Sequence, residues 1–274
     1  MTRREMFAGA VALPGALAMA GEAEAAESTL GFTIGVCSYS FREFQRTLAI
    51  DMMKQMSVSV VSVKDVHLHY GLSRADLQKG ADEFRKAGFT IESAGNTDLK
   101  SDDAGELRRY FEYARACGIP MLVAATTHAA LPKVERLVRE FDIKVAIHNH
   151  GPEDKEFPLP KTVVAAVKGM DPRVGLCMDV GHTMRGGADV VAEIANAGAR
   201  LLEMHMKDLK STTKSSWCQV GDGMMPVVEI FKELRRIGYR GSVDLECEAN
   251  SENPLPEAQH SIGYLKGVAA GLRG

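Results

Sequence analysis

The sequence of 274 residues lacks the short motifs that identify common nucleotide-binding folds. No G-x-G-x-x-G segment follows the first predicted strand, and the chain contains no G-x-x-x-x-G-K-[ST] segment. Its 33 basic and 36 acidic residues nearly balance, giving a formal net charge of -3 without a basic face or an acidic tail. These absences argue against a dinucleotide-binding fold, a P-loop fold and a nucleic-acid partner.

Cysteine is scarce, and its spacing does not indicate a disulfide framework. The number of cysteines is odd, and no two of them form a C-x-x-C motif. The five are Cys37, Cys117, Cys177, Cys218 and Cys247. Three of them fall in predicted strands, so we interpret them as buried thiols. A single disulfide between the first and last predicted strands, Cys37–Cys247, stays open as an alternative.

Long apolar runs are absent outside the N-terminus. Arg3 and Arg4 precede an alanine-rich apolar run over residues 8–20, and Ala23-Glu24-Ala25 resembles a cleavage site. The pattern predicts a twin-arginine export signal over residues 1–25, a periplasmic or otherwise exported destination, and membrane contact only during export. An uncleaved anchor is the alternative, although the run is short for a membrane span of about 20 residues.

The remainder, residues 26–274, alternates between short apolar strands and amphipathic helices. The predicted strands cover 32–37, 58–63, 89–94, 120–125, 144–147, 174–178, 200–206 and 242–247. The predicted helices end near 56 and then cover 74–86, 101–118, 131–140, 161–168, 188–197, 227–237 and 257–272. Eight such units in about 250 residues predict one closed (β/α)8 barrel. A doubly wound open sheet is the main alternative, but it rarely uses eight regular units.

Polar side chains end four consecutive strands of this predicted barrel. They are His148, Asp179, His205 and Glu246, one from each of strands five to eight. The C-terminal ends of barrel strands meet at one mouth, so these four side chains are predicted to hold a divalent metal. Mixed imidazole and carboxylate ligands suit Mn, Zn, Co or Fe and do not suit Ca. One histidine at a strand end is usually only hydrogen-bonded, so the prediction depends on the four occurring together.

Further candidates lie near other strand ends. Lys64 ends the second strand and is predicted to donate to an oxyanion or a substrate oxygen, unless it extends to solvent or pairs with Asp65. His67 follows closely and is a candidate for substrate binding. His150 lies on the same side of its strand as His148, by the period of two. The single tryptophan, Trp217, lies on a predicted polar loop and is a candidate lid or sugar-stacking ring.

The order of four short motifs resembles a known superfamily. They are Asp179-Val-Gly-His182, His205-Met-Lys207-Asp208, Val220-Gly-Asp-Gly223 and Leu245-Glu246. Together they are similar to the successive motifs of the sugar phosphate isomerase/epimerase superfamily, the xylose isomerase-like barrels, which include ketose 3-epimerases, inosose dehydratase and endonuclease IV. The resemblance covers the whole mature chain. It implies Mn or a similar metal at Asp179, His205 and Glu246, with substrate contacts from His182 and Lys207.

The fifth strand departs from that pattern. The epimerases usually carry Glu-Asn-His where this chain has His148-Asn149-His150, and their two glutamates act as an acid/base pair on opposite faces of the sugar. Histidine can replace glutamate as a ligand but removes one of the paired carboxylate bases. We therefore expect a one-base reaction in which His150 or Glu246 removes a proton beside a metal-polarised ketone. With Lys64, these residues are the catalytic candidates.

The leading prediction is a metal-dependent carbohydrate enzyme that acts on a small keto-sugar. Lyase or hydratase action on an oxidised, 3-keto sugar is preferred, with a sugar isomerase or ketose 3-epimerase as the alternative. Mn is the expected metal, with Zn, Co or Fe as alternatives. A non-catalytic periplasmic sugar-binding protein and endonuclease IV-like phosphodiester cleavage are the other classes, and the absence of a basic face argues against the second. Homo-oligomerisation through the last helix or the outer helices is compatible with the sequence.

Overall fold

The computed structural model describes residues 30–272. The predicted export signal over residues 1–25 lies outside the described residues. Within residues 30–272, none of the helices combines the length and the apolar character that a membrane span requires.

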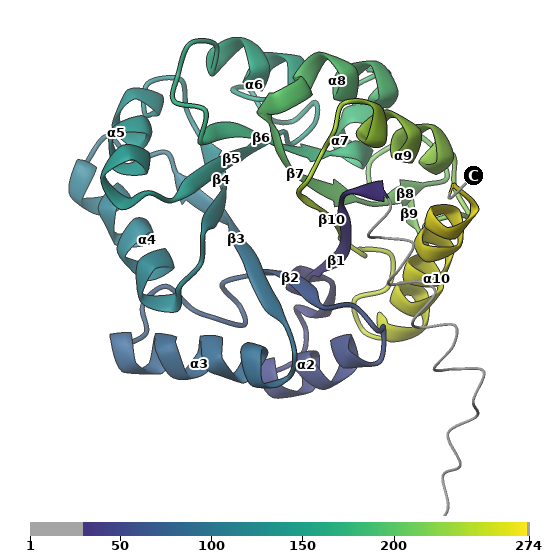
Figure 1. Cartoon of the computed structure of the whole chain (residues 1–274), viewed down its shortest axis with the longest axis horizontal. Coiled ribbons are helices and arrows are strands. Elements are labelled where there is room, and N and C mark those ends of the chain that lie inside the picture. The colour runs from purple at the N-terminus through teal and green to yellow at the C-terminus, as the bar shows by residue number, and fades with distance from the viewer. Residues whose placement is uncertain (1–29, 273–274) are drawn as a thin grey trace, which may run out of the picture.

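Eight parallel strands close into a barrel, which confirms the predicted (β/α)8 fold (Figure 1). Their order around the barrel is β1, β10, β7, β6, β5, β4, β3 and β2. The strands are β1 (Thr33–Cys37), β2 (Val60–Val63), β3 (Thr90–Leu99), β4 (Met121–Thr126), β5 (Lys144–His148), β6 (Val174–Asp179), β7 (Leu201–Met206) and β10 (Ser242–Leu245). Sequential strands are neighbours throughout, so residues far apart in the chain meet at the same end of the barrel.

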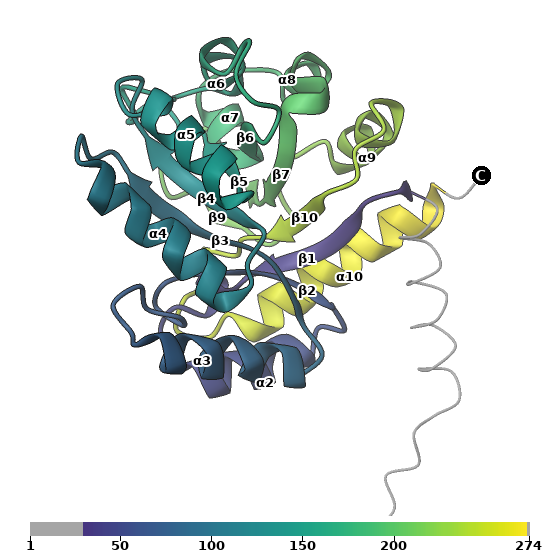
Figure 2. The ribbon, with the colours of Figure 1, turned by 60° about the vertical axis from the view of Figure 1, so that its left-hand side comes forward.

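Helices surround the barrel and cover the outward face of each strand (Figures 1 and 2). They are α2 (Arg46–Lys54), α3 (Arg74–Lys86), α4 (Ala104–Cys117), α5 (Leu131–Phe141), α6 (Pro160–Ala166), α8 (Val190–Ala197), α9 (Val227–Arg236) and α10 (Leu255–Gly271). The predicted helix start at Ser73 is confirmed, because its side chain accepts a hydrogen bond from the backbone N–H of Asp76. Gly118 ends α4 in the left-handed conformation, as its position predicted.

Three local features differ from the sequence prediction. A short helix, α7 (Val180–Arg185), follows β6 directly, because the Asp179 carboxylate caps it at the backbone N–H of His182, 2.7 Å away. The predicted polar loop that carries Trp217 contains an antiparallel pair, β8 (Asp208–Leu209) and β9 (Trp217–Cys218). Strand β10 ends at Leu245, two residues before the predicted end, so the following glutamates lie beyond the ladder.

The barrel interior is polar beneath the mouth. The hydroxyl oxygen of Ser93 lies 2.6 Å from the Ser62 hydroxyl and 2.9 Å from Glu203 Oε1. The Ser242 hydroxyl donates to Asp244 Oδ2 at 2.6 Å. Burial raises the pKa of Asp244 well above its usual range, and the nearby Glu203 carboxylate acts in the same direction. These buried contacts form a floor on which the residues at the mouth are held.

The cysteines are free thiols in the structure, and four of the five are buried. This confirms the interpretation as buried thiols for Cys37, Cys117, Cys177 and Cys247, while Cys218 is half-buried. No disulfide joins Cys37 to Cys247 in the described chain. Cys177 packs inside the barrel against Met121, Val123 and Ala146, and burial raises the pKa of its thiol to about 12.

Candidate metal and substrate site

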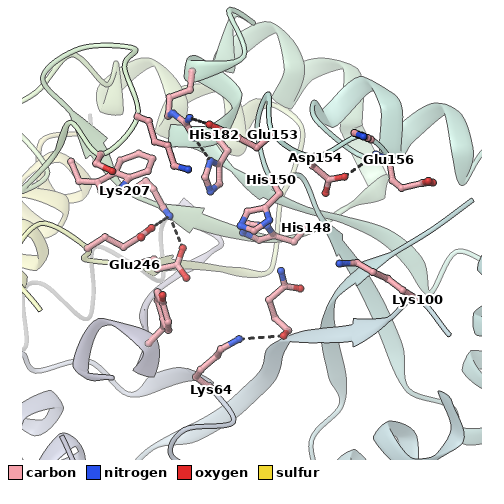
Figure 3. Close-up of a pocket in the computed structure, with 18 residues that line it drawn as sticks. Lys64, Lys100, His148, His150, Glu153, Asp154, Glu156, His182, Lys207 and Glu246 are labelled. Atoms are coloured by element: carbon pink, nitrogen blue, oxygen red, sulfur yellow. Dashed lines mark hydrogen bonds and ion pairs between the residues drawn. The ribbon is translucent and has the colours of Figure 1, made fainter. Parts of the chain in front are cut away.

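The four predicted ligands meet at the C-terminal mouth of the barrel. They are His148 from β5, Asp179 from β6, His205 from β7 and Glu246, which follows β10 (Figure 3 labels His148 and Glu246). Each offers one donor atom, and these atoms all lie within 4.8 Å of one another. Strand register explains the convergence, because Asp179 is paired with His205 across β6 and β7.

The chemistry of these four residues fits a divalent metal. His148 Nε2 lies 3.5 Å from Asp179 Oδ2, and His205 Nδ1 lies 3.5 Å from Glu246 Oε2. His148 Nδ1 is buried without a hydrogen-bond partner among the described residues, and the buried His205 Nδ1 has only the long contact with Glu246. Buried nitrogen atoms that are left unpaired are costly, so this arrangement favours a bound cation. Two imidazoles and two carboxylates suit Mn, Fe, Co or Zn.

The protonation states of three of the four donors also suit metal binding. Burial lowers the pKa of His148 to about 4, so its imidazole is neutral at pH 7. Burial disfavours the charged form of Asp179, but the Lys207 ammonium together with His182 and His148 outweighs it and holds the pKa of that carboxyl well below its usual range. Lys207 together with His205 likewise outweighs burial and lowers the pKa of Glu246. His148, Asp179 and Glu246 are therefore in the deprotonated form that metal ligands require. His205 differs, because Cys177, Cys37 and Glu246 outweigh burial and raise its pKa well above the usual range, so its ring must release a proton when a metal binds.

Lys207 is the central positive charge of the site. Its Nζ lies 2.9 Å from Asp179 Oδ2 and 2.7 Å from Glu246 Oε2, and it also pairs with Glu248. The side chain is only 3% exposed, so three carboxylates compensate a buried ammonium. With His205 neutral, as a metal ligand must be, three negative charges against one positive charge leave two negative charges uncompensated. This residual charge equals that of a divalent cation with the opposite sign.

A cavity of about 810 Å³ opens beside these donors. Its walls include predicted residues from several strand ends, namely Lys64, His148, His150, His182, Lys207, Trp217 and Glu246. The volume lies within the range of about 300–1,000 Å³ that is typical of small-molecule sites. Asp179 and His205 lie beneath the cavity, where they are almost fully buried.

His182 is a neutral hydrogen-bond donor toward the cavity. Its Nδ1 lies 3.1 Å from Arg185 Nη1, and a guanidinium can only donate, so Nδ1 accepts and the ring proton is on Nε2. Burial lowers the pKa of His182 to about 4, which keeps the ring neutral. Arg185 also pairs with Glu153 and lies over the ring of Trp217. Sequence reasoning missed Arg185, although its position three residues after His182 on a helix would have placed the two side chains together.

His150 follows the end of β5 and lines the cavity (Figure 3). Its ring centroid lies 5.3 Å from that of His148 and 4.8 Å from that of His182, both in edge-to-face contact. The three imidazoles therefore form one group at the mouth, with His150 the exposed member. This placement agrees with the prediction that His148 and His150 share a side.

Lys64 reaches the opposite part of the cavity wall from Lys207 (Figure 3). Its Nζ donates to the backbone carbonyl of Asn96 at 3.2 Å and lies 3.7 Å from Asp65. Both interpretations from the sequence therefore apply to Lys64, because its side chain is loosely paired with Asp65 and also faces the cavity. Tyr39 and Asn96 line the same wall and were missed by the sequence analysis, because neither ends a predicted strand.

His67 is outside the candidate site. Its Nδ1 lies 2.9 Å from the Ser38 hydroxyl, and its Nε2 lies 3.2 Å from the carbonyl oxygens of Phe41 and Phe44. The ring is buried and does not line the cavity. Its hydrogen bonds join the turn after β2 to the segment after β1, so the structure gives His67 a supporting position where the sequence predicted substrate binding.

Trp217 forms a wall of the cavity and packs against the site. Its ring centroid lies 5.7 Å from that of His182, and Lys207 Nζ lies 5.0 Å from the ring centre. A Cβ at Gly181 would lie 2.9 Å from Trp217 Cζ3, so a side chain there would displace the ring. The β8–β9 pair holds Trp217 in this position.

Comparison with known protein families agrees with this barrel. A family model described as "Xylose isomerase-like TIM barrel" matches residues 47–268. Among curated proteins, the chain is 28% identical over 154 residues to "Rhizopine catabolism protein MocC" of Rhizobium meliloti. That match covers 49% of this chain and 47% of the relative, so the chain spans about half the length of this relative.

Solved structures share the same fold at low sequence identity. D-psicose 3-epimerase has 17% identity and a TM-score of 0.72, with 87% of this chain and 100% of that chain covered. The probable 3-DHS dehydratase AsbF from Bacillus anthracis has 13% identity and a TM-score of 0.71, with 85% and 98% covered. Likeness at these identities establishes a common barrel architecture.

Proposed function

Because the chain belongs to the xylose isomerase-like TIM barrel family, we propose that it is a metal-dependent enzyme that removes a proton beside the carbonyl of a keto-sugar. The observation that carries this proposal is the set of four converging donors, with Lys207 paired to both of their carboxylates, beside a cavity of about 810 Å³. A small carbohydrate is the proposed substrate, and Mn is the first choice of metal, with Zn, Co or Fe as alternatives.

The four donor residues and the residues of the cavity wall have different proposed roles in the reaction. A divalent metal at these donors would supply a positive centre that polarises the substrate carbonyl. His182 presents its Nε2–H to a substrate oxygen, since Arg185 fixes the other ring nitrogen as an acceptor. Lys64 supplies a second donor from the opposite wall and favours a substrate oxygen at that position.

His150 is the preferred base. Glu246 is paired with Lys207 at 2.7 Å, and that contact stabilises its carboxylate and weakens it as a proton acceptor. The His150 ring makes only ring contacts with His148 and His182 among the contacts of the described residues, and it faces the cavity. Its imidazole is therefore free to take a proton from the carbon beside the carbonyl.

A single base supports elimination or isomerisation better than epimerisation by two carboxylates. In elimination, His150 takes the α-proton, the C–H electrons form a C=C bond, and the β C–O bond breaks. The leaving oxygen keeps the bonding pair and takes a proton from water, so it departs as an alcohol or as water. The cavity is large enough for a sugar and an attached group, which supports lyase or hydratase action on a 3-keto sugar. The dehydratase neighbour supports the same outcome, and the epimerase neighbour supports isomerase or 3-epimerase action as the second candidate.

The experiment that tests this proposal measures deuterium incorporation and release of the leaving group in the same reaction. Purified protein is incubated in D2O with Mn or Co and a 3-keto-glycoside, and products are analysed by NMR and mass spectrometry. Release of the aglycone supports elimination. Deuterium beside the ketone without release supports isomerase or epimerase action, and absence of both refutes proton abstraction.

The competing class is a periplasmic sugar-binding protein without catalysis. Metal analysis and thermal melting distinguish it from the enzyme. If the purified protein holds no metal, and added Mn leaves Tm unchanged, the binding protein becomes the better interpretation.

A further inference from the structure

A thiol lies beside the two imidazoles of the candidate metal site. His148, Cys177 and His205 each offer one donor atom, and these atoms lie within 4.8 Å of one another. All three side chains are buried. We propose that these residues form an alternative metal position that takes thiophilic divalent ions such as Zn²⁺ or Cd²⁺.

The strand register places this thiol below the carboxylate donors. Cys177 is paired with His148 across β5 and β6, whereas Asp179 is paired with His205 across β6 and β7. Cys177 and Asp179 are two residues apart and point to the same face, so their Cα atoms are separated by about 7 Å along the strand. Asp179 thus lies nearer the mouth, and the thiol lies deeper in the barrel interior, where it packs with Val123 and Ala146.

Two donor sets therefore share the same pair of imidazoles. The upper set adds Asp179 and Glu246, and the lower set adds Cys177. His148 Nδ1 has no hydrogen-bond partner among the described residues, and His205 Nδ1 has only the 3.5 Å contact with Glu246, so both rings can offer a nitrogen lone pair to an ion. An ion in one set competes with an ion in the other, because both need these rings and because two divalent charges repel at this distance.

Donor softness decides which ion goes to which set. Carboxylate oxygens suit Mn, whereas a thiolate with two imidazoles suits Zn and Cd. On binding, the Cys177 S–H bond breaks, its proton is released to solvent, and sulfur donates the remaining electron pair to the ion. A tetrahedral Zn site has Zn–S and Zn–N distances of about 2.3 and 2.0 Å, so donors within 4.8 Å need only a small contraction.

Cys37 provides a matched control inside the same barrel. It is buried near the end of β1 and interacts with His205, as Cys177 does. It belongs to neither donor set. A variant at this position therefore removes an interior thiol next to the same histidine and leaves the proposed ligands in place.

The test is a Cd²⁺ titration of the full chain after chelator treatment, followed by the near-ultraviolet thiolate-to-cadmium absorption. The wild type and Cys37→Ser should develop the band with the first equivalent of Cd²⁺. Cys177→Ser and Cys177→Ala should lose it, with folding checked by circular dichroism. The assignment would be overturned if the wild type showed no band or if both Cys177 variants showed a band as strong as that of the wild type. It would also be overturned if Cys37→Ser lost the band.

Mn²⁺ electron paramagnetic resonance provides the second readout. Cys177→Ser should bind Mn²⁺ as the wild type does, because the carboxylate donors are unchanged. One equivalent of Cd²⁺ should release Mn²⁺ from the wild type and release much less from Cys177→Ser. Equal release from both proteins would contradict a thiol-containing site. Neither measurement needs a substrate. The thiol-containing site can therefore be confirmed or refuted whether or not the proposed catalytic function is correct.

Discussion

Replacing Lys207 by methionine tests how much the Lys207 ammonium stabilises the folded protein through its ion pairs in the candidate site. The variant keeps a similar volume but removes the positive charge beside Asp179, Glu246 and Glu248. At contacts of 2.7–2.9 Å and an effective dielectric constant of about 20, each attraction amounts to about 6 kcal/mol before desolvation. Burying the ammonium offsets much of this, so we expect a net loss of about 3–5 kcal/mol in the free energy of unfolding.

The loss should depend on pH in a defined direction. In the wild type the folded-state pKa values of Asp179 and Glu246 lie below their unfolded values. These carboxylates therefore stabilise the fold above the unfolded pKa of about 4, and this contribution is lost as pH falls through the folded pKa. In Lys207→Met, burial and mutual repulsion raise both pKa values, so stability increases as pH falls. The deficit should be greatest near about pH 8 and smaller near about pH 5.

Thermal and urea unfolding of the metal-free protein measure this deficit. A loss of this size corresponds to a Tm lowered by about 6–20 °C for a chain of this length. Added Mn²⁺ should raise the Tm of Lys207→Met more than that of the wild type, because three carboxylates then lack a counter-charge. Lys64→Met is the control, since its Nζ lies 3.7 Å from Asp65 at a partly exposed position, and should lose less than about 1 kcal/mol. A Lys207→Met protein that is as stable as the wild type, or a deficit that does not change with pH, would refute the reasoning.

Three further predictions separate binding, catalysis and export. His148→Ala should weaken Mn²⁺ binding by calorimetry, whereas His150→Ala should bind Mn²⁺ normally and lose at least about 100-fold in kcat, the scale of a missing general base. Arg185→Met should lower kcat about tenfold and move the ring proton from a fixed Nε2 to a mixture of tautomers, seen by ¹⁵N NMR of labelled histidine; an unchanged tautomer would contradict it. Replacing Arg3 and Arg4 by lysine should leave the protein in the cytoplasm on cell fractionation, and normal export would remove the twin-arginine interpretation.

The barrel and its four converging donors could be predicted because both follow from local periodicity. Each strand is a short apolar run, and the side chain at its C-terminal end must lie at the common mouth. His148, Asp179 and His205 all occupy such positions in the structure. Glu246 also reaches the group, although it lies just beyond β10. A prediction based on strand ends still places a side chain at the mouth when the strand ends one residue earlier than predicted, provided that the chain continues in the direction of the strand.

The rest of the site depends on turns and short elements that periodicity cannot detect. Tyr39 lies in a 3-10 turn after β1, and Arg185 lies in α7, a helix of six residues. Asn96 lies in the extended second half of β3, beyond the predicted strand. His67 was misplaced for the same reason, because the backbone turns after β2, with the His67 N–H donating to the Lys64 carbonyl, and carries the ring toward Ser38.

The net charge of the site offers a physical reason why this chain has histidine at the end of the fifth strand, where the epimerases usually have glutamate. The epimerases that the sequence resembles usually have glutamate where this chain has His148. Around Lys207 there are already three carboxylates, so a fourth would leave three uncompensated charges beside a divalent ion. The neutral imidazole keeps the balance at two, and burial lowers its pKa to about 4 so that this balance persists at pH 7. On the proposed function, histidine at this position would keep a metal ligand while removing a carboxylate base, which is why we propose His150 as the group for a one-base reaction.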